Sequence, residues 1–482
     1  MNQIETPSAR RPLVDGSTRT KPKTVDLLND WQYLEKSIHR IVSGWGRRLT
    51  GWSDKSALHR QVWEQSEVVR RLRQRVKEFP GGKPDAAVST RLEELANTVL
   101  LAPSLEDALD GIHFLLGKAV VTAYVEYTTK AHPIHDAPTA AILHEINQIK
   151  AGQWLWFREY RRRNPHTTNP EYFNKITRLI AELGGFLEPQ ASTTPGARPA
   201  GVGTDFTLPK FSARDIPTKP KHDFMPYVRA DFATSLEARR LFWAYAYMLE
   251  KNLPDDQLFW IFYGHFMPWD WHADVSRHLW DESRHGDSGY SRLRDFGILP
   301  EEVGFPSYNN DDQIRELNAI AAGKKTTDYA DYLDQLADEP AEPLTAGDIY
   351  EAVFFIGMIA ENGHFVVKNE AYKDFQAGKD MESAEMMLFD IIDETTHVQY
   401  AHRWLPVLAE HAGIKHEGYR ERAAKIRAEY EQGEKSKISA FTLSRDINDP
   451  AYAFYQDLLS RIRKISPLEN ADSCPERSSK PM

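Results

Sequence analysis

The sequence predicts an all-α protein with two helical bundles in tandem. Apolar residues recur at three- and four-residue intervals along most of its 482 residues, and the alternating pattern of β-strands is nearly absent. Long periodic stretches also lack glycine and proline, the two residues that most often end helices. A segment rich in proline and glycine separates two groups of long helices, and each group is large enough for one bundle.

The N-terminal half begins with a polar arm, residues 1–24, which we expect to be disordered. Apolar periodicity then predicts a first bundle over residues 25–163. Its helices are expected at 26–48, 56–79, 104–130 and 136–163. Nine prolines follow between Asn164 and Pro226, so we interpret 164–231 as a linker that contains one short helix at 170–184.

The helical pattern resumes over residues 232–415, where we predict the second bundle. Its helices are expected at 232–252, 255–266, 270–290, 346–375 and 381–411. A mixed insertion interrupts it at 300–344, and 416–482 should add one or two terminal helices and a disordered tail. A weak internal repeat supports the tandem arrangement, because Trp63-Glu-Gln-Ser resembles Trp280-Asp-Glu-Ser.

The composition argues against several classes of protein. The formal net charge is −10, whereas a general nucleic-acid binder normally carries a basic surface. Cys474 is the only cysteine, which excludes an intramolecular disulfide, a cysteine zinc site and a cysteine-ligated iron–sulfur cluster. The N-terminus lacks an apolar secretion signal, and the sequence contains no run of about 18 apolar residues. We therefore expect a cytoplasmic protein that binds neither nucleic acid nor membranes.

Two short motifs in the second bundle contain side chains that can bind a metal ion. Both Asp281–His285 and Asp393–His397 follow the pattern Asp-Glu-x-x-His, and both lie in strongly helical sequence. Residues three apart share one face of a helix, so each motif can direct a carboxylate and an imidazole at the same point. Such a pair suits iron, manganese or zinc, and two copies in one chain predict a metal site built from two helices.

Metal-binding bundles of this kind take a further glutamate from each of two other helices. Glu361 lies 33 residues before Glu394, and a turn near 376–381 falls close to the midpoint. Glu250 lies 32 residues before Glu282, with a turn just after residue 266. Each pair should therefore lie side by side in an antiparallel hairpin. The predicted ligands of a dinuclear site are Glu250, Glu282, His285, Glu361, Glu394 and His397.

The four predicted carboxylates would balance two divalent metal ions, which removes most of the cost of burying them. Asp281 and Asp393 are candidates for accepting hydrogen bonds from the ligand histidines, each from the histidine of the opposite motif. Glu250 precedes a predicted helix end, so Glu237 is the alternative ligand if the helix breaks there. His364, three residues after Glu361, is a candidate additional ligand.

Other histidines and the aromatic residues have simpler interpretations. We interpret His265, His272 and His278 as surface or packing residues. The tryptophans and phenylalanines around 242–280 form either core or the wall of an apolar pocket. If the internal repeat is real, non-ligating residues replace most of the ligands in the first bundle, which then serves as scaffold, dimer surface or pocket wall. Gln65, Val68, Asn147 and a valine at 120–121 stand at such places, and His144 stands at the place of Glu394.

The sequence Asp-Glu-Ser-Arg-His at 281–285 resembles the Asp/Glu-Glu-x-Arg-His pattern of the ferritin-like di-iron carboxylate superfamily. That superfamily includes bacterial multicomponent monooxygenases, acyl-carrier-protein desaturases, rubrerythrins and ribonucleotide reductase small subunits. The resemblance covers roughly 232–411, and Thr396 stands where the second motif would have arginine. It implies a ferritin-like four-helix bundle, two bound iron ions and activation of O2. Mn/Fe and Mn/Mn pairs suit the same ligands.

The resemblance implies a non-haem di-iron oxidase or oxygenase that acts on a small organic substrate, with O2 as co-substrate. Hydroxylation, N-oxygenation, desaturation and oxidative C–C cleavage all remain open. An external electron donor is expected because the sequence shows no flavin or iron–sulfur motif, and a homodimer would be typical of such bundles. The alternatives are iron handling as a ferroxidase, peroxide reduction, a radical-generating subunit that uses Tyr400, and a non-enzymatic scaffold.

Overall fold

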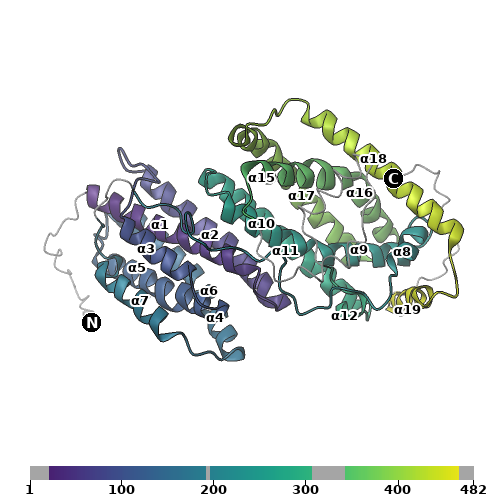
Figure 1. Ribbon diagram of the computed structural model, residues 1–482, viewed down its shortest axis with the longest axis horizontal. Helices are drawn as coiled ribbons and strands as arrows, with labels where there is room; N and C mark the ends of the chain where they lie inside the picture. Colours follow the sequence, from purple (N-terminus) through teal and green to yellow (C-terminus); the bar gives the residue numbers. More distant parts are fainter. Residues whose placement is uncertain (1–20, 191–195, 307–341, 466–482) are drawn as a thin grey trace, which may run out of the picture. The chain divides into compact units, whose positions relative to one another are not determined.

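The computed structural model describes residues 21–190, 196–306 and 342–465, and all regular elements in these ranges are helical (Figure 1). The all-α prediction is thereby confirmed for the described part of the chain. Most of the expected arm (1–24), most of the expected insertion (300–344) and the expected tail from residue 466 lie outside the described residues. The chain divides into two compact units, unit 1 with residues 1–41 and 67–205, and unit 2 with residues 42–66 and 206–482.

The division into units cuts through two helices, α1 (Lys21–Gly46) and α2 (Trp52–Lys77), whereas the sequence analysis assigned 25–163 to one bundle. Buried charges hold the intervening segment in unit 2. Arg47 donates a 2.7 Å hydrogen bond to the carbonyl oxygen of Asp255, and the Lys55 ammonium lies 3.0 Å from the Asp255 carboxylate. Residues 42–66 therefore belong to unit 2 because they satisfy buried polar groups there.

Unit 1 contains the N-terminal part of α1, the C-terminal part of α2 and several further helices. These are α3 (Thr90–Leu100), α4 (Leu105–Leu109), the π-helix η1 (Asp110–Gly117), α5 (Lys118–Lys130), α6 (Ala137–Arg163), α7 (Pro170–Glu182) and the short 3-10 helix η2 (Gly184–Phe186). The stretch 105–130 is long and apolar enough to cross a membrane by composition, but 61% of that window is buried inside the structure, as in a core helix.

The core of unit 1 contains a buried carboxylate, Glu35, whose partners include a tyrosine and a lysine. Glu35 accepts a 2.9 Å hydrogen bond from the Tyr124 hydroxyl and a 2.6 Å hydrogen bond from Lys150. This buried ion pair neutralises the carboxylate. Within the described part of unit 1, no three histidine or acidic side chains gather closely enough to hold a metal ion.

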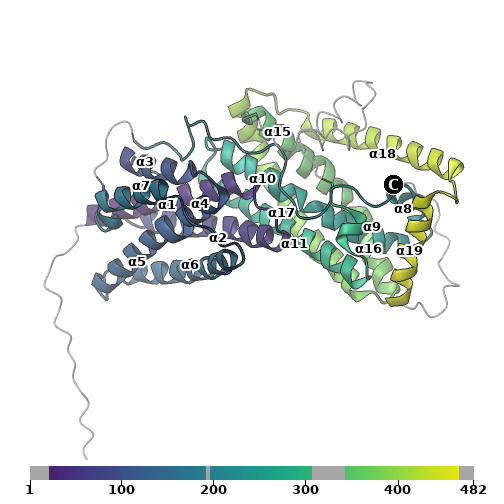
Figure 2. The ribbon, with the colours of Figure 1, turned by 60° about the horizontal axis from the view of Figure 1, so that its bottom comes forward.

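Unit 2 contains a central group of long helices and several peripheral ones. The central elements are α9 (Leu236–Glu250), α11 (Trp269–Asp295), the run of α15 (Ala346–Phe354), π-helix η3 (Phe355–Glu361) and α16 (Asn362–Ala377), and α17 (Met381–Ala412). The peripheral ones are α8 (Met225–Asp231), α10 (Asn252–Tyr263), α12 (Pro300–Val303), α18 (Tyr419–Ser444) and α19 (Pro450–Ile465). Helix α11 packs between α9 and α17, and α17 packs on α15 and α16 (Figure 2).

Two helices occur where the sequence analysis expected none. Helix α3 begins after Ser89, whose side chain accepts a hydrogen bond from the Arg91 amide as an N-cap. Helix α8 has Pro226 in its first turn, within the proline-rich segment that was interpreted as linker. Proline is compatible with the first turn of a helix because the amide that it lacks has no helical partner there.

Helices α9 and α11 approach closely at Gly289. A Cβ atom at this position would lie 2.2 Å from the Met248 amide nitrogen and 2.5 Å from the Ala244 carbonyl oxygen. Because both neighbours are backbone atoms, only separation of the helices could relieve the overlap. We expect Gly289→Ala to lower the free energy of unfolding by about 1–3 kcal/mol, measured by urea denaturation. In the matched control Gly433→Ala, nothing lies within 4 Å, so stability should hold or rise. An unchanged urea midpoint for Gly289→Ala would contradict this account.

The start of α17 is fixed by Asp380. Its carboxylate accepts hydrogen bonds from Arg240 at 2.7 Å, from Arg292 at 2.6 Å and from the Ser383 amide at 3.1 Å. Asp380→Asn keeps a capping side chain but leaves the fully buried Arg240 without its counter-charge. We expect a loss of about 3–5 kcal/mol in the free energy of unfolding, measured by denaturant titration at pH 7.

The same variant should show a characteristic pH dependence. Burial alone would raise the pKa of Asp380, but Arg292 and Arg240 outweigh it and lower that pKa. The stabilisation is therefore present above the ordinary aspartate pKa of about 4 and is lost as the pH falls through the lower folded-state value. The stability difference between the parent and Asp380→Asn should shrink in acid, and a difference that grew there would contradict the assignment.

Candidate metal centre

Helices α11 and α17 each carry three inward-facing side chains at the same spacing. On α11 they are His278, Glu282 and His285, and on α17 they are Asp390, Glu394 and His397. All six are buried. Positions four and then three residues apart fall on one face of a helix, so each helix presents a continuous row of ligating groups. The two rows face each other at the centre of unit 2.

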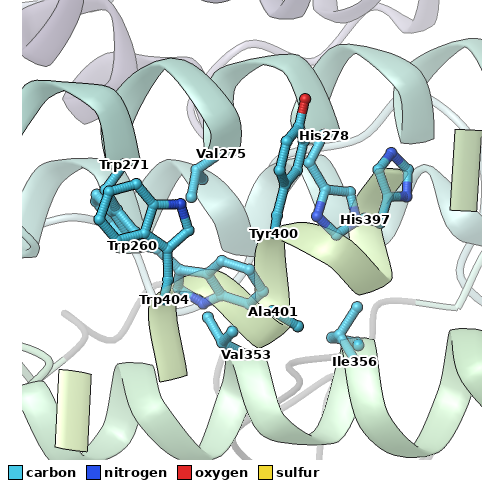
Figure 3. A pocket seen from close by; sticks show the side chains of 11 residues that line it. Trp260, Trp271, Val275, His278, Val353, Ile356, His397, Tyr400, Ala401 and Trp404 are labelled. Carbon is cyan, nitrogen blue, oxygen red and sulfur yellow. The ribbon is translucent and has the colours of Figure 1, made fainter. Parts of the chain in front are cut away.

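The first group of converging side chains contains His278, Glu282, Glu361 and His397, with one ligating atom of each within 4.8 Å of the others. His278 Nε2 lies 2.8 Å from Glu361 Oε1 and 3.3 Å from Glu282 Oε1. His397 Nδ1 lies 3.3 Å from both of these oxygens. The two imidazoles stack with their centroids 3.7 Å apart (Figure 3). Two imidazoles and two carboxylates make a donor set for one divalent transition metal.

A second set of side chains adjoins the first. Glu250, Glu282 and His285 form one group, and Glu250, Asp390 and Glu394 form another. His285 Nδ1 lies 3.3 Å from Glu250 Oε2, 3.6 Å from Glu282 Oε2 and 3.3 Å from Asp390 Oδ1. Glu282 therefore belongs to both sets, with one oxygen toward each. A carboxylate shared in this way is suited to lie between two metal ions.

The polar atoms at this centre converge without satisfying one another. Several buried atoms lack a well-oriented hydrogen bond to any described residue, although they lie within hydrogen-bonding distance of other polar atoms. These atoms are Glu250 Oε2, His278 Nε2, His285 Nδ1, Glu361 Oε1 and Oε2, Glu394 Oε2 and His397 Nδ1. Buried polar atoms are seldom left unpaired. Their convergence, together with the nitrogen and carboxylate donor set, fits bound metal ions.

Two aspartates orient the ligand histidines from the side opposite the ligating nitrogens. Asp393 Oδ2 lies 3.2 Å from His285 Nε2, and Asp281 Oδ2 lies 3.3 Å from His397 Nε2. Each aspartate thus meets the histidine of the opposite motif. Burial would raise the pKa of Asp281, but hydrogen bonds from His397, Arg277 and Arg284 outweigh it and lower that pKa. An ionised Asp281 holds a proton on His397 Nε2 and leaves Nδ1 free for a metal.

A buried lysine enters the second set. Lys368 on α16 pairs with Glu394, lies 2.7 Å from Asp390 Oδ2 and lies 3.9 Å from Glu250 Oε1. Four carboxylates were predicted for this centre, and Asp390 is a fifth. Lys368 cancels the additional negative charge. The net charge of the protein groups is again −4, which two divalent ions would neutralise.

The structure brings all six predicted ligand residues together. Glu250 is the last residue of α9, and although the helix does end there, its side chain still reaches His285. The alternative, Glu237, lies in the first turn of α9 and instead contacts Ser235 and Arg463. His364 is exposed and belongs to none of the candidate ligand groups.

Three residues of the centre were missed by the sequence analysis. His278 was interpreted as a surface or packing residue; the surface interpretation is wrong, because His278 is buried between Glu282 and Glu361 and belongs to the first candidate ligand group. Asp390 and Lys368 were not considered. A signal for two of them was present, since His278 and Asp390 each precede a motif glutamate by four residues, on the same helical face. Nothing in the sequence marked Lys368.

An apolar cavity borders the first group. Its walls include Trp260, Trp271 and Trp404, and His278 and His397 form one end (Figure 3). Its free space is about 20 Å³, which is room for a single water. A second cavity, of about 300 Å³, reaches His285 from the other side.

Comparison of the chain with protein-family models, with curated proteins and with solved structures found no match.

Proposed function

We propose that unit 2 holds a dinuclear metal centre and that the protein is a non-haem di-iron oxidase or oxygenase with a ferritin-like bundle. The observation that supports this best is the pair of adjoining ligand groups that share Glu282, with donor atoms in both that lack a well-oriented hydrogen bond. Glu250, Glu282, His285, Glu361, Glu394 and His397 would hold the metal ions, with His278 and Asp390 as further ligands. The resemblance of 281–285 to the ferritin-like di-iron pattern favours iron, with manganese as the alternative.

Bound iron in such a centre supplies the electrons that reduce O2. The residues of this chain would prepare the centre for that chemistry. Asp281 and Asp393 keep the protons of His397 and His285 on Nε2, so that both imidazoles present Nδ1 to the metals. Burial of Glu282, Glu361 and His397 limits the contact of the first group with bulk water. A small organic substrate and an external electron donor complete the proposal.

The π-helix η3 supports a functional role for this region. Glu361, the ligand that lies nearest His278, is its last residue. Single π-helical turns within α-helices are uncommon and occur frequently at functional sites, because the wider turn displaces side chains from the regular helical positions. Here the turn coincides with a ligand of the first group.

The test is metal analysis of protein produced with ample iron, alongside the double variant Glu282→Ala/Glu394→Ala. We expect about two iron ions per chain in the parent and almost none in the variant, with helical content unchanged by circular dichroism. Absence of metal from both proteins, with the fold intact, would exclude the enzyme and leave the scaffold alternative.

Iron handling is the second candidate function, and one observation favours it. The larger cavity at His285 carries the acidic side chains of Asp295, Glu382 and Glu385, which could attract ferrous ions. Oxygen consumption distinguishes the two functions. A ferroxidase consumes O2 when supplied with ferrous iron alone, whereas an oxygenase with both metals bound requires an organic substrate and a reductant.

A further inference from the structure

We propose that the cavity at His285 is the substrate site and that it takes a small cationic amine with an apolar body. The proposal rests on the proposed function, because it places the substrate beside the second set of ligands. It goes beyond that function by naming the chemical class of the substrate.

Volume decides which cavity receives the substrate. The tryptophan-lined cavity offers about 20 Å³, enough for one water. The cavity at His285 offers about 300 Å³, which is the lower end of the range found for sites that bind small molecules. Of these two cavities, the one at His285 is therefore the one that admits a substrate of more than a few atoms without moving its walls.

The walls of this cavity are amphipathic. Met386 and Phe389 supply apolar surface, and Ser288 and Ser291 supply hydroxyl groups, whereas the Tyr247 ring borders the cavity but is itself fully buried. The Tyr247 ring packs edge-on against the His285 imidazole, with the centroids 6.1 Å apart. Because His285 itself lines the cavity, an apolar group at that end of the cavity would be close to the second set of ligands. Phe389 is 59% exposed although it lines the cavity, so a bound apolar group would shield it from water.

The positive charges of the wall are already neutralised. Arg284 pairs with Asp281 and lies 2.7 Å from Asp393. Arg292 lies 2.6 Å from Asp380 and 3.5 Å from Asp295. Both guanidinium groups are therefore paired with carboxylates of the protein, so neither leaves an uncompensated positive charge that would favour an anionic substrate.

Two negative charges of the wall are not neutralised. Glu382 and Glu385 lie in the first two turns of α17 and line the cavity. Neither makes a hydrogen bond or an ion pair with any residue in the described ranges. The cavity therefore carries two unpaired negative charges. The candidate metal ligand His285 lines the same cavity. An ammonium group would pair with Glu382 and Glu385 at the mouth while the apolar body extended toward Tyr247.

Binding of three probes of one size tests this assignment by isothermal titration calorimetry. Benzylamine, benzyl alcohol and benzoate share a ring and differ in charge. We expect benzylamine to bind about tenfold more tightly than benzyl alcohol, and benzoate to bind more weakly than either. Raising the salt concentration should weaken benzylamine binding, since the two carboxylates are exposed. Benzoate binding as tight as that of benzylamine would overturn the proposal.

Variants locate the site. Glu382→Gln/Glu385→Gln should weaken benzylamine binding about tenfold and leave benzyl alcohol unchanged. The matched control Glu410→Gln removes another exposed carboxylate of α17 that does not line the cavity, and should have no effect. Ser288→Trp should fill the cavity and abolish binding of all three probes. Unchanged benzylamine affinity in both the double variant and Ser288→Trp would overturn the proposal.

Metal analysis of the same samples separates this inference from the proposed function. Protein that contains two metal ions but does not prefer benzylamine would overturn the substrate assignment alone. Protein that binds benzylamine through Glu382 and Glu385 but contains no metal would overturn the di-iron function and leave a binding site for amines.

Discussion

Glu282→Ala is expected to remove more bound metal than any other single substitution in this protein. One oxygen of Glu282 lies 3.3 Å from both His278 Nε2 and His397 Nδ1, and the other lies 3.6 Å from His285 Nδ1. Loss of this carboxylate therefore takes a donor from both ligand sets. We expect metal content to fall from about two ions per chain to well below one, measured by elemental analysis after dialysis.

Glu394→Ala provides the comparison, because Glu394 belongs only to the second set. This variant should retain about one metal ion, held by His278, Glu282, Glu361 and His397. Glu237→Ala is the control outside the centre and should keep both ions. Equal losses in Glu282→Ala and Glu394→Ala would contradict a carboxylate shared between two sets. Full metal content in Glu282→Ala would exclude the centre as described.

Lys368→Met is expected to strengthen binding of the second metal ion. The Lys368 ammonium pairs with Glu394 and Asp390, so it competes with a metal for their oxygens and repels the incoming cation. The carboxylates that Lys368 pairs with or approaches are Glu250, Asp390 and Glu394, all of which belong to the second set. Removal of a unit positive charge a few ångströms away should tighten the second dissociation constant by at least about tenfold and leave the first unchanged. Calorimetric titration of metal-free protein with Mn²⁺ measures both constants.

The same substitution should make folding depend on metal. Without Lys368, the metal-free protein buries carboxylates that lack a counter-charge, which costs about 3–5 kcal/mol. Metal addition should therefore raise the melting temperature of Lys368→Met more than that of the parent. Lys55→Met removes another buried lysine, whose partner Asp255 belongs to none of the ligand groups. It should lose stability without any change in metal affinity. A weaker second site in Lys368→Met would show that the lysine supports metal binding rather than opposing it.

The two halves of the centre, the first group and the second set of ligands, differ in composition and in charge. The first half contains two histidines and two carboxylates, and one divalent ion would neutralise it. The second contains an additional carboxylate, Asp390, and an internal cation, Lys368. We expect the first half to fill at lower metal concentration than the second. A single binding step for two ions in the parent protein would contradict this order.

Local sequence determined the helices and the identity of most candidate ligands. Apolar periodicity depends only on side chains a few residues apart, so the long helices could be located to within a few residues. The Glu-x-x-His spacing places each motif pair on one helical face whatever surrounds it. The nearly equal intervals from Glu250 to Glu282 and from Glu361 to Glu394 implied antiparallel hairpins, because a turn lay near each midpoint. These features needed no knowledge of the tertiary structure.

Tertiary structure alone decided which further residues complete the centre. His278 and Asp390 share helical faces with the motif glutamates, but only the packing of the helices brings His278 to Glu361 and Asp390 to His285. Lys368 reaches Glu394 and Asp390 only because α16 packs against α17. Glu250 rather than Glu237 contacts His285 because the close approach at Gly289 sets α9 against α11 in that register. Contacts between helices depend on packing across the whole unit, and spacing within one helix contains no information about them.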